Sequence, residues 1–284
     1  MTAFALEAWA AARRAELDAL LAARITQPAR ADDPGRLIES VRYSLLSPGK
    51  RLRPLLALAA AEAVGGPAGE AARIAAASIE LVHCYSLIHD DLPAMDDDDL
   101  RRGQPTNHKV FGEAVAILAG DALVTLAFEW IAEAGLLART RGEGGDYLRA
   151  AVALARGAGV WGMVRGQARD LAEPPPVTLS DIEQLHREKT GGLFRAAVEI
   201  GGAVAGASEA QLEALGRFGE RYGVAFQHAD DRDDAEHGGF AEQARARMVN
   251  LVAEALTTLE TFDHRAEPLR AIAGALALRA GGRA

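Results

Sequence analysis

The stretch HCYSLIHDDLPAMDDDDLRRGQPTNHK, residues 83–109, combines a dense run of acid with two arginines directly after it. Its aspartates are Asp90, Asp91, Asp96, Asp97, Asp98 and Asp99, and its arginines are Arg101 and Arg102. Ionised carboxylates this close repel one another, so an ordered form of the segment needs counter-charge. A hard divalent cation, Mg²⁺ or Ca²⁺, supplies it through oxygen ligands. The first two aspartates also fall at the predicted end of a helix, where the helix dipole disfavours anions unless a cation binds.

A second acidic cluster lies far along the chain, in FQHADDRDD, residues 226–234. Asp230 and Asp234 are four residues apart and share one face of a predicted helix, while Asp231 lies about 100° around it. Gln227 precedes Asp230 by three residues, so its amide reaches the same site. Two separated acidic clusters and nearby arginines indicate a site that holds metal ions and a phosphorylated substrate between them. The alternative is that both clusters are solvated acidic surface.

Apolar residues recur at helical spacing almost throughout the chain, and no long stretch alternates with a period of two. Aromatic residues make up only 5%, which favours helix over strand. We predict helices over 2–24, 34–46, 53–64, 68–91, 112–134, 146–162, 163–172, 208–235, 240–261 and 265–280. A further helix starts at the S-x-x-E capping box of Ser180 and Glu183, with a kink at Gly191-Gly192. Residues 93–109 are predicted to be a polar connection. One all-α domain over residues 1–284 is the simplest interpretation.

Composition and charge exclude several classes of function. The net charge of −9 argues against nonspecific nucleic-acid binding. The single cysteine, Cys84, excludes an internal disulfide and fits a reducing compartment, so we expect a cytoplasmic protein. The N-terminus has no cleavable signal pattern. No run of about 18 uninterrupted apolar residues occurs, so we expect no insertion into a membrane.

Basic and polar residues at three further places are candidates for contact with phosphate. Residues 49–53, GKRLR, put three cations beside a glycine between two predicted helices, and helix N-termini attract phosphate. His83 lies seven residues before Asp90, two turns away on the same helix face. Lys189, one of only three lysines, is followed by Thr190. The alternatives are a basic surface turn, a core histidine and an exposed helix lysine.

The chain lacks the sequence signals of several other reaction classes. There is no G-x-x-x-x-G-K-[ST] and no zinc-ligand spacing, and no nucleophile triad is evident. A metal-bound diphosphate without a nucleophile points to ionisation chemistry, because diphosphate leaves readily once metal and cations neutralise it. The remaining fragment is a carbocation, which requires an allylic substrate and a dry, apolar pocket lined by helices.

Six blocks of sequence resemble, in order, the blocks of a known family. They are GKRLRP, HCYSLIHDD with the acidic run after it, ILAGDAL, GMVRGQARDL, HREKTGGLF and FQHADD. By these blocks the chain is similar to the trans-isoprenyl diphosphate synthases, and nearest to the bacterial farnesyl diphosphate synthase branch. The resemblance covers roughly residues 35–235. It implies an isoprenoid synthase helical bundle around a deep central cavity, usually in a homodimer.

The resemblance also implies a role for each matched residue. Three Mg²⁺ ions would be bound by Asp90, Asp96 and Asp230, with Asp91, Asp231 and Asp234 in support. The allylic diphosphate would meet these ions and Arg101, Lys189 and Gln227. Isopentenyl diphosphate would bind Lys50, Arg53, His83 and Arg102. Thr190 and Gln227 would help to stabilise the carbocation, and the released diphosphate is the family's presumed base for the last proton.

Product length is a steric question in this family, because the growing chain passes down the cavity beside the helix that precedes Asp90. Tyr85 lies five residues upstream and matches the bulky floor of the family's C15 enzymes. A rise of about 1.5 Å per residue puts it roughly 7–8 Å below the metals. The resemblance therefore implies a farnesyl product, with geranylgeranyl diphosphate as the alternative.

The sequence departs from the family's pattern after Asp234. The family has a loop with glycine and lysine there, and its lysines contact the allylic diphosphate, whereas this chain reads AEHGGFAEQARARMVNL. Arg245 or Arg247 is the candidate substitute. The missing lysines also motivate a different class of function, a non-catalytic partner subunit of an active synthase. A terpene cyclase is a third alternative, but it would need no isopentenyl site.

Overall fold

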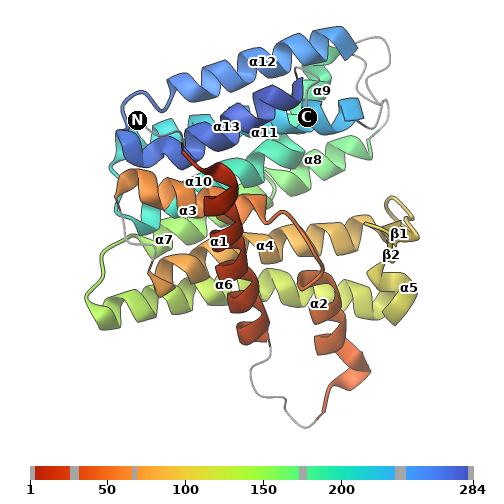
Figure 1. Cartoon of the computed structure of the whole chain (residues 1–284). Helices are drawn as coiled ribbons and strands as arrows, with labels where there is room; N and C mark the ends of the chain where they lie inside the picture. The colour runs from red at the N-terminus through yellow and green to blue at the C-terminus, as the bar shows by residue number, and fades with distance from the viewer. Residues whose placement is uncertain (1–3, 26–31, 66–68, 173–177, 234–240, 281–284) are drawn as a thin grey trace.

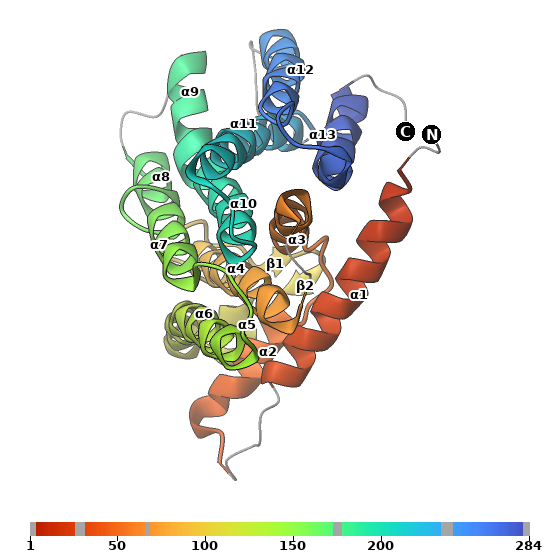
Figure 2. The ribbon, with the colours of Figure 1, turned by 90° about the vertical axis from the view of Figure 1, so that its left-hand side faces the viewer.

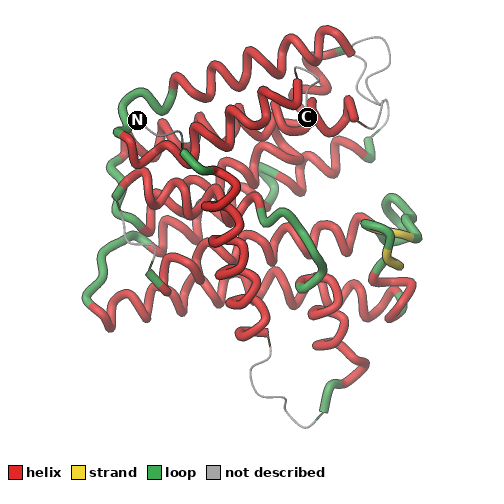
Figure 3. The backbone as a smooth tube through the Cα atoms, viewed as in Figure 1, coloured by secondary structure: helices red, strands yellow, loops and turns green. Residues whose placement is uncertain are grey.

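The computed structural model describes residues 4–25, 32–65, 69–172, 178–233 and 241–280, and almost all of these residues are helical (Figures 1 and 3). The predicted all-α fold is therefore confirmed. The helices are α1 (Leu6–Ile25), α2 (Leu37–Leu45), α3 (Leu52–Val64), α4 (Glu70–Asp90), α5 (Asn107–Phe111), α6 (Glu113–Arg141), α7 (Tyr147–Ala158), α8 (Met163–Asp170), α9 (Leu179–His186), α10 (Gly192–Val204), α11 (Glu209–Asp233), α12 (Ala241–Thr257) and α13 (Glu267–Ala280). Short 3-10 turns, η1 (Pro34–Arg36) and η4 (His264–Ala266), precede α2 and α13.

Helix α4 lies at the centre of the bundle because it is apolar on nearly every side. Its buried residues run from Ala71 to Ile88. It packs along α6 and also contacts α3 and α10, and α10 in turn packs on α7 and α11. In Figures 1 and 2 the layers follow one another from α6 through α4 and α10 to α11 and α12. The two acidic clusters lie at the C-terminal ends of two helices of this bundle, α4 and α11.

A glycine permits one of the central helix contacts. At Gly201 of α10, an added Cβ would meet the carbonyl oxygen of Ala57 in α3 at 1.9 Å. No larger residue fits there without a backbone shift, so α3 and α10 approach more closely than side chains would allow. This contact holds α3, and the cations at its N-terminus, against the middle of the bundle.

The segment after α4 is more ordered than the predicted polar connection over 93–109. It contains a small antiparallel pair, β1 (Leu100–Arg101) and β2 (Gln104–Pro105), and the start of α5. Arg102 adopts a positive φ of 54° in the turn between the strands, and so does Gly103 after it, with a φ of 76°. The hairpin folds the acidic segment back, because Thr106 donates its backbone N–H to the carbonyl oxygen of Asp99 at 3.0 Å.

Several predicted helix boundaries were wrong: α7 ends at Ala158 and not at residue 162, and α12 ends at Thr257 and not at residue 261. The capping box that starts α9 consists of Thr178 and Asp181, not Ser180 and Glu183, and their side chains and backbone N–H groups bond reciprocally at 3.2 Å. Helix α6 continues to Arg141, beyond the predicted end at residue 134, and stops where Gly142 adopts a φ of 67°. Between α9 and α10 the predicted kink takes the form of a π-helical turn, η2 (Arg187–Gly191).

Among the described residues, α4 and α6 are long and apolar enough to span a membrane by length and composition alone. The apolar window of α4 is 72% buried, which marks a core helix, whereas that of α6 is 39% buried. Exposed apolar side chains on α6 include Ile117, Leu118 and Leu136. The absence of membrane insertion stays a prediction.

Candidate active site

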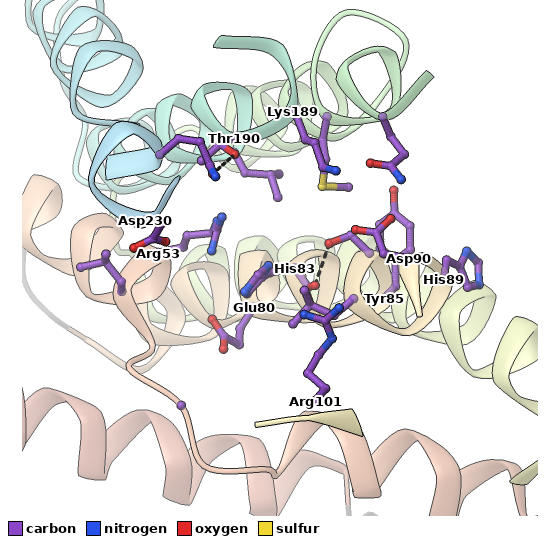
Figure 4. Close-up of a pocket in the computed structure, with 18 of the residues that line it drawn as sticks. Arg53, Glu80, His83, Tyr85, His89, Asp90, Arg101, Lys189, Thr190 and Asp230 are labelled. Atoms are coloured by element: carbon purple, nitrogen blue, oxygen red, sulfur yellow. Dashed lines mark hydrogen bonds between the residues drawn. The ribbon is translucent and has the colours of Figure 1, made fainter. Parts of the chain in front are cut away.

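A cavity of about 1080 Å³ opens between α4, α8, η2, α10 and α11 (Figure 4). Its apolar wall includes Met163, Leu193 and Phe226. The sequence-predicted residues that line it are Lys50, Arg53, His83, Tyr85, Asp90, Arg101, Arg102, Lys189, Thr190, Gln227 and Asp230. Residues up to 180 positions apart in the chain therefore meet at one site, as the two-cluster interpretation requires.

Asp90 lies at the last position of α4 and faces the cavity. Burial raises the pKa of its carboxyl group to about 6, and the neighbouring charges of Asp96 and Asp91 add to this, whereas Lys189 opposes it. A carboxylate that is costly to ionise in the protein alone is one that a cation would stabilise, because the cation takes the place of the proton.

The other predicted members of the first acidic cluster do not line the cavity. Asp91 is buried and accepts a hydrogen bond of 2.6 Å from Nε of Arg101. Asp96 is exposed, although its backbone N–H donates to the carbonyl oxygen of Asp90 at 2.8 Å. Arg101 also bonds Asp98 at 3.2 Å. One aspartate thus faces the site, while its neighbour in sequence holds Arg101 at the cavity wall.

The two arginines at the start of α3 both line the cavity but differ in their partners. Arg51 is buried and bonds Asp18 at 2.8 Å and Glu80 at 3.0 Å. Arg53 lies over the ring of Phe194 at 4.6 Å, and its Nε is buried without a hydrogen-bond partner. Burial lowers the pKa of Arg53 to about 10, so the guanidinium remains charged at neutral pH. A buried charged donor without an acceptor indicates a place for an anion.

His83 faces the cavity from α4 beside this charge (Figure 4). Burial holds the pKa of its imidazole well below the usual value, and the charges of Arg53 and Arg102 lower it further. The imidazole is therefore neutral at physiological pH and can donate one N–H without adding charge. Arg102 reaches the same wall, where its Nη1 donates to the carbonyl oxygen of Pro48 at 2.7 Å.

On the opposite wall, the π-helical turn η2 brings two polar residues to the cavity. Lys189 pairs with Asp170 of α8. Thr190 donates its hydroxyl to Oε1 of Gln227 at 2.9 Å. A π-helical turn shifts the helix register by one residue, and such turns are frequent at functional sites. The sequence pair Lys189-Thr190 is thus at the site, not on an exposed helix face.

Asp230 is the second aspartate that lines the cavity, and Figure 4 shows it well apart from Asp90, with His83 between them in this view. Asp231 is buried outside the lining and bonds Gln227 at 2.6 Å and His186 at 2.9 Å. Asp234 lies outside the described residues. Asp230 and Asp231 therefore lie on different faces of α11, as the helical spacing of the two residues predicted.

Neither arginine that we predicted as a replacement for the missing lysines lines the cavity. Arg247 bonds Glu183 and Glu254 at 2.8 Å each, and Arg245 is exposed on α12. A cation that does contact Asp230 comes from the C-terminal helix α13, where Nη2 of Arg279 lies 3.5 Å from Oδ1 of Asp230. No sequence signal predicts this contact, because only tertiary packing brings α13 to α11.

The block GMVRGQARDL also contributes a polar side chain to the cavity. Gln167 of α8 lines the cavity, and both polar atoms of its amide are buried without a hydrogen-bond partner. An unsatisfied buried amide costs free energy unless a ligand or water bonds it. Gln167 is therefore a position where a bound molecule would be held.

The donor set fits a hard divalent cation only in part. Asp90 and Asp230 offer carboxylate oxygens, which Mg²⁺ prefers. Within the described ranges, no three carboxylate, imidazole or thiol groups come close enough to hold a metal ion by themselves. Mg²⁺ commonly takes one or two carboxylates and completes its shell with water and substrate phosphate. The two aspartates therefore fit ions that arrive with a diphosphate.

The helical bundle and its cavity define an all-α isoprenyl synthase fold. Residues 34–239 match the model of the family described as polyprenyl synthetase. Because the match spans most of the chain, the chain belongs to the polyprenyl synthetase family.

Named relatives support this membership. A farnesyl diphosphate synthase from Geobacillus stearothermophilus is 48% identical over 208 residues, covering 73% of this chain and 69% of the relative. The chloroplastic geranylgeranyl pyrophosphate synthase 12 of Arabidopsis thaliana is 47% identical over 205 residues, covering 70% of this chain. The match spans only 55% of that relative's length.

Solved structures match over nearly the whole chain. An FPP/GFPP synthase from Zymomonas mobilis superposes with a TM-score of 0.86 and 38% identity, covering 96% of this chain and 98% of that one. A geranyltransferase from Legionella pneumophila gives a TM-score of 0.81 and 34% identity, with 97% and 96% coverage. The names of the relatives include products of different length.

Proposed function

We propose that the protein is a Mg²⁺-dependent prenyltransferase that condenses isopentenyl diphosphate head-to-tail with an allylic diphosphate. One observation carries this proposal: an acidic group, Asp90, and a cation whose Nε is buried without an acceptor, Arg53, face the same largely apolar cavity. Such a cavity suits two diphosphates, one held by metal and one by cations, with hydrocarbon chains between them. Membership of a family of prenyl synthases supports the same conclusion.

The isopentenyl diphosphate is assigned to the cationic wall. Lys50, Arg53 and Arg102 supply charge, and neutral His83 supplies a hydrogen-bond donor. Arginine forks match phosphate oxygens, so the Nε of Arg53 would gain the acceptor that it lacks. An imidazole that stays neutral beside three cations adds a donor without further charge repulsion.

The allylic diphosphate is assigned to the space between Asp90 and Asp230. Asp90 and Asp230 would hold Mg²⁺ there, three ions per site in the family's manner, with Asp96 completing the set by a movement of its exposed loop. Arg101 and Lys189 would contact the diphosphate directly. Asp91 and Asp231 support the site through Arg101 and Gln227, since their oxygens already bond those residues. Asp234 keeps its predicted supporting role.

Mg²⁺ in this site would neutralise the diphosphate and make it a better leaving group. The allylic carbon–oxygen bond breaks with its electron pair on the departing diphosphate, and the double bond of isopentenyl diphosphate supplies the pair for the new carbon–carbon bond. The oxygens of Thr190 and Gln227 face the positive carbon. The apolar wall excludes the water that would otherwise capture it. The released diphosphate takes the final proton, so the chain needs no base of its own.

We further propose a farnesyl product, with Tyr85 as the floor of the cavity. Tyr85 lines the cavity, and its ring packs edge-on against His89 with 5.6 Å between centroids. This packing fixes the ring where a longer chain would have to pass. Geranylgeranyl diphosphate remains the alternative product, and relatives carry both names.

A homodimer is proposed from the outer face of α6 (Figure 2). Leu118 is 54% exposed and Leu136 is 55% exposed, and they lie 18 residues apart, about five turns along one helix face. The exposed residues Thr125 and Glu129 lie between them on that face, so the two leucines are separate apolar contact points. We assign both to an interface with a second copy of the chain, which would cover them.

Replacing both Leu118 and Leu136 with glutamate is expected to convert a dimer into a monomer, because two like charges would face their copies across the interface. Light scattering coupled to gel filtration measures the change. The control is Ala210→Glu, which adds charge on exposed α11. A protein that is already monomeric, or a double variant that stays dimeric, would contradict the assignment.

Two other functions remain alternatives. The missing lysine loop favours a non-catalytic partner subunit, whereas the intact cavity with Asp90 and Asp230 disfavours it. A terpene cyclase shares the ionisation chemistry but would consume one substrate, and it would leave the cationic wall without a ligand. Incubation with isopentenyl and dimethylallyl diphosphates, with and without EDTA, separates the three by mass spectrometry. We expect an EDTA-sensitive C15 product that forms only when both substrates are present.

A further inference from the structure

Four side chains form a continuous series of polar contacts between the η2 region and α11, and we call this series the ladder. Its members are His186, Asp231, Gln227 and Thr190. His186 ends α9, and Nε2 of its ring lies 2.9 Å from Oδ2 of Asp231. The other oxygen of Asp231 accepts a bond of 2.6 Å from Nε2 of Gln227. The oxygen of Gln227 accepts the Thr190 hydroxyl at 2.9 Å. His186 and Thr190 are four residues apart, and so are Gln227 and Asp231, so each helix contributes two adjacent turns.

The ladder decides which end of the Gln227 amide faces Thr190. An amide has one accepting oxygen and one donating NH₂ group, and these can exchange places by a rotation of 180°. Asp231 accepts only, so it holds the NH₂ group. The carbonyl oxygen must then lie on the side of Thr190, and the Thr190 hydroxyl donates its hydrogen bond to that oxygen. The free lone pairs on both groups are left toward the cavity, where Thr190 and Gln227 are lining residues.

His186 helps to hold Asp231 in this orientation through the contact between its Nε2 and Oδ2 of Asp231. The imidazole is buried, with 5% of its surface exposed, and Asp231 is 7% exposed, so water does not compete for the bond. Without it, a buried carboxylate would lose one of its hydrogen-bond partners, and its orientation toward Gln227 would be less restrained.

We propose that His186 is a positioning residue for the ionisation step, acting through Asp231 to present the oxygens of Gln227 and Thr190 to positive charge. This inference rests on the proposed function, and it adds a residue that has no contact with the cavity. Oxygen lone pairs stabilise a carbocation, whereas an NH₂ group turned inward would repel it. The effect should therefore fall on the step that develops positive charge and not on diphosphate binding.

The test compares His186→Ala with Leu185→Ala. Leu185 is the adjacent residue of α9 and is also buried, and its loss weakens the packing of that helix without touching the ladder. For His186→Ala we expect kcat to fall about tenfold or more, with the KM for isopentenyl diphosphate unchanged. Leu185→Ala should keep the wild-type kcat. His186→Gln places an amide N–H within reach of Asp231 and should recover much of the lost kcat.

A binding measurement gives the same answer without turnover. An ammonium analogue of the prenyl cation, titrated with diphosphate and Mg²⁺ in a calorimeter, reports how well the site receives positive charge. We expect about tenfold weaker binding of the analogue to His186→Ala and little change in Leu185→Ala. Equal values of kcat and of analogue affinity in wild type and His186→Ala would overturn the inference, as would an equal loss in Leu185→Ala. An inactive wild type would count against the proposed function, and the calorimetric comparison would still decide the role of His186.

Discussion

Asp90→Asn and Asp230→Asn are each expected to lower kcat by about 10²- to 10³-fold, because each removes one of the two aspartate carboxylates that line the cavity. The substitution keeps the shape of the side chain and removes the charge that would hold Mg²⁺ at the leaving diphosphate. Steady-state kinetics with saturating isopentenyl diphosphate measures the effect. Raising the Mg²⁺ concentration should recover part of it, since the remaining ligands bind the ion more weakly.

The matched control for this prediction is Asp99→Asn. Asp99 belongs to the same acidic run, but it is exposed and pairs with Lys109 at 2.6 Å, outside the cavity. Exposed ion pairs contribute little, so this variant should behave as wild type. If Asp90→Asn and Asp99→Asn lowered kcat to the same small extent, the acidic run would act as a diffuse charge and not as a metal site.

Tyr85→Ala is expected to change the main product from C15 to C20. Removing the ring opens the cavity below Asp90, and the growing chain then accepts a further five-carbon unit before it meets a wall. The expected effect is an inversion of the product ratio, because a steric stop acts on every chain that reaches it. Mass spectrometry of the products formed from geranyl diphosphate and excess isopentenyl diphosphate measures this ratio.

Tyr85→Phe is the control, since it keeps the ring and removes only the hydroxyl group. It should leave C15 as the main product. A Tyr85→Ala protein that still stops at C15 would remove Tyr85 from the floor, and a wild type that already makes C20 would do the same. Neither result would contradict the proposed role of Asp90 in metal binding.

Helical periodicity carried much of the site prediction. His83 and Asp90 are seven residues apart, and the structure puts both on the cavity wall because two turns of helix return to the same face. The same periodicity separated Asp230 from Asp231. Periodicity alone did not predict that Asp91 would bond Arg101 while Asp90 lines the cavity. That difference depends on the hairpin after α4, which places Arg101 beside Asp91.

Contacts between distant helices could not be read from local patterns. Arg279 reaches Asp230 across 49 residues of sequence, and Arg247 turns to Glu183 and Glu254 instead of the cavity. Both outcomes follow from how α12 and α13 pack on α11. His186 stood in a recognised block, yet its role required the observed bond to Asp231. In this chain the sequence blocks predict which residues lie at the site, whereas the hydrogen-bond partners of each side chain depend on how the helices pack.

The most direct test of the account is the time course of diphosphate release by the purified chain alone, given geranyl and isopentenyl diphosphates with Mg²⁺. The account predicts steady release, one diphosphate for each C15 product, that stops with EDTA and falls sharply in Asp90→Asn. Absence of release from either geranyl or dimethylallyl diphosphate, at any Mg²⁺ concentration, would contradict it and would favour a non-catalytic partner subunit.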